Sequence, residues 1–211
     1  MSKLDFIYKR HSVRKFTDAP VPEEDIRELI KAATYAPSGK NLQNWHFVVI
    51  TDKNKIDEIA RIVDNKNAKL AEYLKDEAKI KTFRGSAPYH TVFKGAPVLI
   101  LVYASPYEMI ADLLLEAGVM PREEAQSYGR SNPAIQNISA AMENLLLAAA
   151  NLDYGTCWMT GPTYAADEIS EYIGFSKPGF YLAAMTPLGV PASTGTNPAR
   201  KPVDEVLTFI R

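Results

Sequence analysis

Two arginines and a serine at alternating positions near the start of the sequence could bind a phosphate group. In the stretch RHSVRKF, residues 10–16, the side chains of Arg10, Ser12 and Arg14 point the same way if the chain is extended. Guanidinium groups pair with phosphate oxygens in a forked geometry, and a hydroxyl adds a neutral donor. A solvated basic surface stretch is an equally good interpretation of this segment alone, because short basic runs are common.

A second pair of cations, Arg200 and Lys201, stands between Pro198 and Pro202 in a loop that is rich in small residues. The two prolines stiffen the backbone that presents these cations. This arrangement favours a second phosphate contact, and a solvated loop is the alternative.

Two further segments have the composition of ligand-binding loops. The stretch PSGKNLQNW, residues 37–45, joins an expected helix to an expected strand and contains Asn41 and Gln43. Amide side chains both donate and accept hydrogen bonds, so they could recognise the edge of a heteroaromatic ring. Thr160 and Gly161 follow another expected strand, where a glycine would let a ligand approach the backbone. Each of the two segments, taken alone, is more simply an ordinary turn.

The composition excludes several classes of protein. The 211 residues are 46% hydrophobic and 23% charged, which is typical of a globular chain. A formal net charge of -1 provides little attraction for nucleic acid or for an anionic membrane. One cysteine and three scattered histidines indicate neither an intrachain disulfide nor a metal site. We therefore expect a soluble, cytoplasmic protein that binds no metal, nucleic acid or membrane.

Hydrophobic periodicity predicts the elements that must position these segments. Residues 98–103 are apolar throughout, which is typical of a central strand covered on both faces. Residues 135–151 form a helix that is apolar around most of its circumference, as expected in a core or a subunit interface. Other helices are predicted from Pro22 to before Pro37 and over 56–63, 65–82 and 166–173, and other strands over 47–50, 156–159 and 181–185.

The elements add up to a single α+β domain over residues 1–211, with four or five strands wrapped by helices. Residues 83–96 are expected to be an irregular cover, and residues 104–133 are broken into short pieces by proline and glycine. The tail, residues 203–210, alternates in apolar character and resembles a strand without an evident partner.

The four chemical segments, in this order and at these distances, resemble the flavin-dependent nitroreductase family. RHSVRKF is similar to the family's RRSxRxF start, and APSGKNLQNWHF is similar to its APSxxNxQPWxF loop. NLLLAAANLDYGTCWMTG resembles the family's core helix and the glycine-containing turn after it, and PLGVPA…NPARKP resembles its GxP…RKP end. The matches run from residue 10 to about residue 202, which is nearly the whole chain.

The resemblance implies a nitroreductase-like fold with a central, mostly antiparallel sheet, and an intertwined homodimer with FMN at the subunit interface. Residues 203–211 would be a tail that embraces the partner subunit, and residues 65–133 would be a variable cover over the pocket. The matched residues are expected to bind the cofactor: Arg10, His11, Ser12, Arg14, Arg200 and Lys201 at its phosphate and pyrimidine ends, Pro37, Ser38, Gly39, Asn41 and Gln43 along the flavin, and Thr160, Gly161 and Asn137 beside it.

The implied activity is hydride transfer from NAD(P)H to FMN, followed by reduction of an electron-poor acceptor such as a nitroaromatic or a quinone. The flavin would carry the chemistry, and Arg14 would stabilise negative charge on it; no other catalytic side chain is assigned. The alternatives are a reductive dehalogenase, a flavin-modifying enzyme and a flavin-storage protein without turnover. The sequence departs from the family pattern at Asn44, where proline is usual, and at Thr160, where some members have glutamate.

Overall fold

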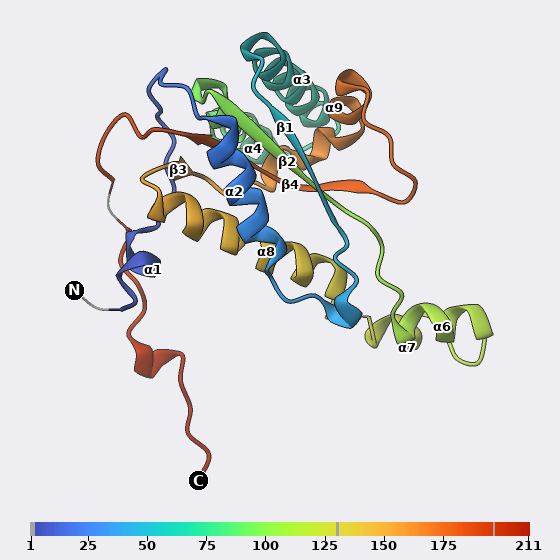
Figure 1. The fold of residues 1–211 in the computed structure, drawn as a ribbon. Coiled ribbons are helices and arrows are strands. Elements are labelled where there is room, and N and C mark those ends of the chain that lie inside the picture. Colours follow the sequence, from blue (N-terminus) through green and yellow to red (C-terminus); the bar gives the residue numbers. More distant parts are fainter. Residues whose placement is uncertain (1–2, 130, 196) are drawn as a thin grey trace.

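Four antiparallel strands form one sheet with helices on both faces (Figure 1). The structure is a computed structural model that describes residues 3–129, 131–195 and 197–211. The order in the sheet is β1-β2-β4-β3. The strands are β1 (Trp45–Ile50), β2 (Val98–Ala104), β3 (Gly155–Thr156) and β4 (Tyr181–Gly189). The predicted α+β class and the mostly antiparallel sheet of four to five strands are confirmed.

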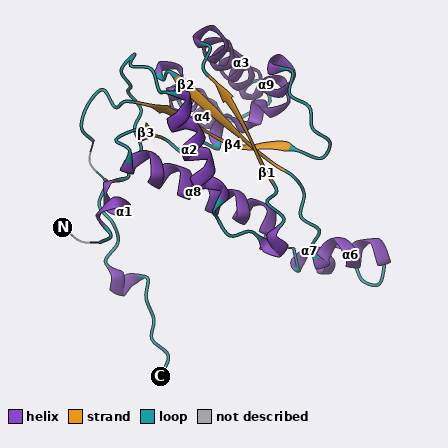
Figure 2. Cartoon of the chain, in the orientation of Figure 1, coloured by secondary structure: helices purple, strands orange, loops and turns teal. Residues whose placement is uncertain are grey.

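Nine α-helices are found in the described part of the chain (Figure 2). The long helices α2, α3 and α8 and the short helix α9 pack on the sheet, whereas the others are short surface helices. Their bounds are α1 (Asp5–Lys9), α2 (Glu23–Thr34), α3 (Lys53–Ala71), α4 (Glu77–Gly85), α5 (Ala87–His90), α6 (Ile110–Ala117), α7 (Arg122–Ser127), α8 (Pro133–Asn151) and α9 (Ala166–Ile173).

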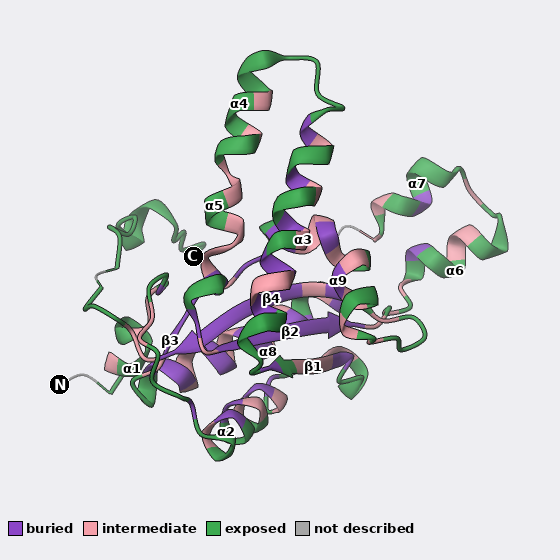
Figure 3. Ribbon diagram, turned by 90° about the horizontal axis from the view of Figure 1, so that it is seen from above, coloured by how far each residue is buried: buried purple, intermediate pink, exposed green. Residues whose placement is uncertain are grey.

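Strand β2 is the centre of two hydrophobic cores, because all of its residues are buried. Successive side chains of a strand point to opposite faces of the sheet. Ile100 and Val102 therefore pack with α2 and α8 on one face, while Leu101 and Tyr103 pack with α3 and α9 on the other. This layering confirms the central strand that was predicted from the continuous apolar run (Figure 3).

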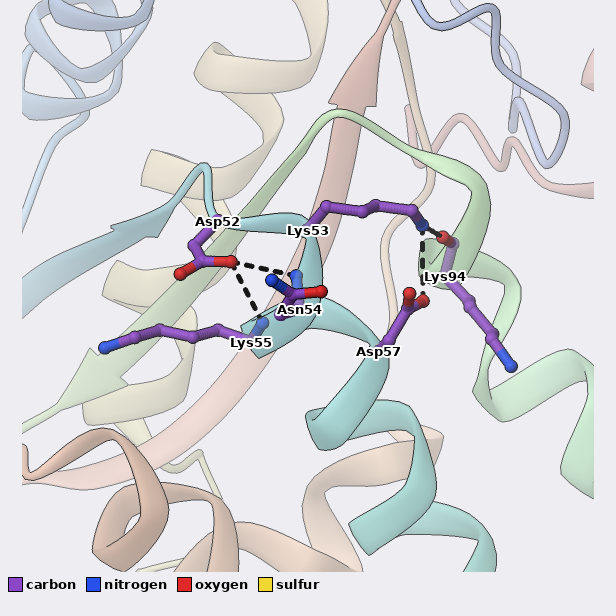
Figure 4. Close-up of polar contacts among 6 residues, drawn as sticks. All are labelled: Asp52, Lys53, Asn54, Lys55, Asp57 and Lys94. Atoms are coloured by element: carbon purple, nitrogen blue, oxygen red, sulfur yellow. Dashed lines mark hydrogen bonds and ion pairs between the residues drawn. The ribbon is translucent and has the colours of Figure 1, made fainter.

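Acidic and basic side chains fix the connection from β1 to α3 (Figure 4). The Asp52 carboxylate caps α3, since it accepts from the backbone N–H groups of the helix's first turn, at 2.8 Å for Asn54. The Lys53 ammonium pairs with Asp57 at 3.3 Å and also donates to the backbone carbonyl of Lys94. These contacts attach the start of α3 to the segment that leads into β2.

The predicted strand over residues 156–159 is wrong beyond Thr156. The backbone carbonyl of Thr156 accepts from the N–H of Val13 at 2.8 Å, and the N–H of Cys157 donates to the Thr186 hydroxyl at 3.2 Å. These bonds replace further ladder bonds to β4, and pairing resumes only as an isolated bridge at Met159. The apolar run is buried, although most of it is not a strand.

Two other expectations need correction. The polar stretch over residues 65–82 is not one helix, because α3 ends at Ala71 and Asp76 caps a separate helix, α4. The tail forms a short 3-10 helix at Val203–Glu205 and then no strand, and its side chains are exposed. Residues 104–133 do form short pieces in their described part: α6 and α7 make a hairpin that projects away from the sheet (Figures 1 and 3).

Candidate functional site

The phosphate segment, residues 10–16, lies beside the end of β3. Ser12 makes a parallel bridge with Thr156, and Val13 is buried beneath it. Because side chains alternate along an extended chain, the neighbours of Val13 face the opposite way. Ser12 and Arg14 are exposed, and Arg10 is half-buried. The expected alternation of these three side chains is therefore compatible with the structure.

Arg10 has an acidic neighbour that was not expected from the sequence. Its Nε lies 3.5 Å from a carboxylate oxygen of Glu143 on α8. The two residues are 133 positions apart in the sequence, so no local pattern could identify the pair. Arg14, Arg200 and Lys201 have no ion pair with any described residue, and their positive charges remain available to an anion.

The C-terminal segment runs antiparallel to the N-terminal one. The N–H of Ala192 donates to the carbonyl of Lys15 at 3.0 Å, and the Asn197 amide donates to the carbonyl of Tyr8 at 2.7 Å. The same direction carries Arg200 and Lys201 beyond Tyr8, and both are exposed. His11 lies in this region too, in a cavity of about 740 Å³ that is also lined by Asn197. Within one chain, Arg200 and Lys201 therefore lie away from Arg14.

The amide loop, residues 37–44, lies at the beginning of α8. Lys40, Asn41 and Gln43 adopt left-handed backbone conformations, with φ angles of 55°, 51° and 47°. Such conformations are unfavourable for residues with a side chain. The Ser38 hydroxyl accepts from the N–H of Gln43 at 3.1 Å, which closes the loop on itself. Pro37, Asn41 and Gln43 are exposed, whereas Ser38 and Gly39 are half-buried.

Asn137 lies directly under this loop and uses both ends of its amide inside the protein. Its Oδ1 accepts from the N–H of Gly39 at 3.0 Å, and its Nδ2 donates to Oδ1 of Asn44 at 2.8 Å. Both asparagines are buried. Asn44 was noted in the sequence only as a departure from the family pattern, and its buried contacts were not expected.

The turn at Thr160 and Gly161 is exposed, and His90 lies against it. A Cβ built on Gly161 would lie 2.5 Å from Cδ2 of the His90 ring. His90 Nδ1 is 3.3 Å from the hydroxyl of Tyr164, which donates to the carbonyl of Val63. Burial lowers the pKa of the His90 imidazole, which favours the neutral ring. The space beside the Gly161 Cα is therefore filled by His90, a residue that the sequence analysis missed.

The predicted residues form two groups in one chain. The phosphate segment is joined to Thr156, five residues beyond the end of α8, and Thr156 leads on to Thr160 and Gly161. The amide loop is joined to Asn137, near the other end of that helix. Since a helix rises about 1.5 Å per residue, Asn137 and the end of α8 at Asn151 are about 20 Å apart along its axis.

The donors of this site fit an anionic, heteroaromatic ligand such as FMN. Arg14, Arg200 and Lys201 are exposed cations without an internal partner, and Ser12 adds a hydroxyl. Thr160 and Gly161, which follow the bridge between Met159 and Met185, are exposed as well. The described residues contain no cluster of histidine, cysteine and carboxylate side chains that could hold a metal ion. None of the described helices is long and apolar enough to cross a bilayer.

Comparison with known proteins agrees with these features. A flavoprotein of Clostridium difficile 630, called BluB-like, is 40% identical to this chain; the match covers all of both chains with a TM-score of 0.92. A relative from Archaeoglobus fulgidus, provisionally named NADH dehydrogenase/NAD(P)H nitroreductase, is 31% identical over 74% of this chain and 66% of its own length. An iodotyrosine deiodinase from Thermotoga neapolitana is 32% identical, over 89% and 87% of the two chains.

Nitroreductases solved with FMN share the fold, with TM-scores of 0.73, 0.70 and 0.65 at 21%, 22% and 25% identity. The model of the nitroreductase family matches residues 7–190, which include both the phosphate segment and the amide loop. This chain belongs to the nitroreductase family.

Proposed function

We propose that this protein is an FMN-dependent oxidoreductase that uses NAD(P)H to reduce an electron-poor small molecule, such as a nitroaromatic or a quinone. The proposal rests on the bridge between Ser12 and Thr156, because it sets the alternating Arg10, Ser12 and Arg14 beside the strand end that leads to Gly161. The similarity to a flavoprotein over the whole chain and the names of the relatives support the same activity.

FMN, when bound, would supply the electron transfer between NAD(P)H and the acceptor. Arg10 and Ser12, with His11, would hold its phosphate, and Arg14 would place a positive charge where negative charge develops on reduction. Thr160 and Gly161 would offer backbone N–H groups. The remaining proposed contacts are Pro37, Ser38, Gly39, Asn41 and Gln43 along the flavin, and Arg200 and Lys201 at the phosphate.

We also infer that the working form is a homodimer, with the site built from both subunits. In one chain the amide loop is bonded to Asn137 near the start of α8, whereas Ser12 is bridged to Thr156 beyond the end of that helix, so a second chain would have to bring one group to the other. The tail supports this inference, since its apolar side chains Val206, Phe209 and Ile210 are exposed. We propose that residues 203–211 pack on the partner and that residues 65–133 cover the pocket.

The test is to purify the protein, record its visible spectrum and add NADH or NADPH without oxygen. We expect a yellow protein that releases FMN on denaturation and loses its absorbance with NAD(P)H. A colourless protein that takes up no added FMN would refute the proposal. A yellow protein that fails to bleach with either nucleotide would instead indicate flavin storage.

Reductive dehalogenation is the second candidate function, because an iodotyrosine deiodinase is 32% identical over most of both chains. The reduced protein should be mixed anaerobically with an iodinated phenol and with a nitroaromatic, and iodide release compared with nitro reduction. Iodide release in step with flavin reoxidation would favour dehalogenation. Recovery of less intact FMN than was bound would instead indicate a flavin-modifying activity.

A further inference from the structure

A buried pair of amides supports the amide loop from below. Asn44 and Asn137 are 2% and 6% exposed; Asn44 directly precedes β1, and Asn137 lies on α8. Asn137 accepts from Gly39 and donates to Asn44. Asn44 then donates through Nδ2 to the backbone carbonyls of Ser105 at 2.9 Å and Ala134 at 3.3 Å.

The chain of bonds fixes the orientation of both amides. A backbone N–H can only donate, so the atom of Asn137 that faces Gly39 must be the oxygen. Its nitrogen therefore faces Asn44, which must accept there with its own oxygen. The nitrogen of Asn44 is left facing two carbonyls, which can only accept. Each amide thus has one orientation that satisfies all of its neighbours.

The amide loop needs such support, because three of its residues have left-handed backbones. Each costs about 1–2 kcal/mol in a residue with a Cβ, so contacts around the loop must maintain the shape. Inside the loop, Ser38 contributes one bond to Gln43. The bond from Gly39 to Asn137 connects the loop to α8, the best buried helix of the fold.

The same pair joins the loop to the base of the α6–α7 hairpin. Asn44 and Ser105 exchange two bonds, since the Ser105 N–H also donates to the Asn44 carbonyl at 2.9 Å. Two residues further on, the ring of Tyr107 lies against Gly39, and the Lys40 ammonium is 5.3 Å from the centroid of that ring. The loop, the end of β2 and the start of α8 are therefore held as one unit.

We infer that Asn137 and Asn44 are positioning residues: they set the shape of the amide loop, and Asn137 acts on the cofactor through Gly39 and not by touching it. The inference rests on the proposed function, in which this loop lines the flavin. It revises the expectation that Asn137 is a direct contact, because the residue is buried and its amide oxygen and nitrogen are each bonded inside the protein.

The first test compares Asn137→Ala with Asn144→Ala in the full chain. Asn144 lies on the same helix and donates to the carbonyl of Ala32 on α2 at 3.3 Å, so its replacement also removes a bond from α8. We expect N137A to weaken FMN binding by about 10- to 100-fold, because the loop loses the bond that holds Gly39 and must be reordered when FMN binds. N144A should change the dissociation constant by less than about twofold.

Hydrogen exchange of the peptide over residues 37–44 tests the contact independently of the cofactor. Exchange in the apoprotein should become faster in N137A and stay unchanged in N144A. Unchanged exchange in N137A would overturn the contact, and faster exchange with unaltered FMN affinity would overturn the positioning role. A wild-type protein that binds no FMN would refute the proposed function, and with it the flavin role of this loop.

Asn137→Asp provides a second variant of the same size, in case N137A fails to fold. A protonated carboxyl offers one donor and one acceptor, as the amide does, whereas an ionised one can only accept. The FMN affinity of N137D should therefore fall as the pH rises through the pKa of the new carboxyl. The ratio of wild-type to N137D affinity over the same range separates this step from titration of the FMN phosphate, whose second pKa is about 6. A flat ratio would contradict the donor role.

Discussion

At the scale of single residues, Arg14 is the most informative position for the proposed activity. Its side chain is exposed and has no ion pair with any described residue, so removing it should disturb the fold little. We expect Arg14→Ala to weaken FMN binding about tenfold or more, since hydrogen bonds to charged groups contribute about 1.5–3 kcal/mol. Reduction by NAD(P)H should slow as well, because a fixed charge that favours the reduced flavin is lost.

Lys15 provides the matched control for this experiment. It is an exposed cation next to Arg14, but it follows on the other side of the extended segment. Its structural contact is a backbone carbonyl that accepts from Ala192, which Lys15→Ala retains. Titration of the apoproteins and stopped-flow reduction should therefore leave K15A close to wild type. Equal effects of R14A and K15A would indicate general electrostatics and would remove the specific role of Arg14.

Local backbone geometry could be predicted from the sequence, whereas contacts between distant segments could not. The alternation around Val13 follows from an extended chain and agrees with the structure. The bond from Asn137 to Asn44 spans 93 residues, and the left-handed backbone at Lys40 is not encoded by a glycine. The pairing of Glu143 with Arg10 depends in the same way on tertiary packing, which no local pattern contains.

At the scale of elements, the turn after β3 carries a steric prediction. Gly161→Ala would place a methyl group against the His90 ring, which is held by Tyr164. Such overpacking costs about 1–3 kcal/mol, so G161A should lower the free energy of unfolding by that order. His90→Ala opens the space, and in that background G161A should cost much less. Urea unfolding of the two single variants and the double variant measures the coupling.

Equal costs of G161A in both backgrounds would contradict this packing. The result bears on the site, because the glycine was expected to let a ligand approach. The structure gives a reason inside the protein for a residue without a side chain at this position.

Elements with strong periodicity, such as β2 and α8, were predicted nearly to their ends. The short β3 was not, since Thr156 and Cys157 bond to Val13 and Thr186.

At the scale of the whole molecule, the tail carries the prediction about assembly. Phe209 and Ile210 are 74% and 96% exposed, which is unusual for large apolar side chains. Burying such a side chain contributes about 1.5–3 kcal/mol, so several of them could hold two subunits together. We expect deletion of residues 203–211 to raise the dissociation constant of the dimer by about 100-fold or more, measured by light scattering over a concentration series.

A point variant tests the apolar contact of the tail without shortening the chain. Phe209→Glu should weaken the dimer strongly, whereas Thr208→Glu adds the same charge one position earlier and should act less, because neighbours in an extended tail face opposite ways. A full-length protein that is monomeric at micromolar concentration would contradict the dimer. Loss of FMN together with loss of the dimer would support a site shared between subunits.

The place of β1 in the sheet has a consequence for the newly made chain. Within the described structure β1 pairs only with β2, so one side of its backbone has N–H and C=O groups without a strand partner. Another extended chain can form backbone hydrogen bonds with such an edge and lengthen the sheet. Aggregation therefore competes with correct assembly during synthesis, and the yield of soluble protein should depend on how soon that edge is covered.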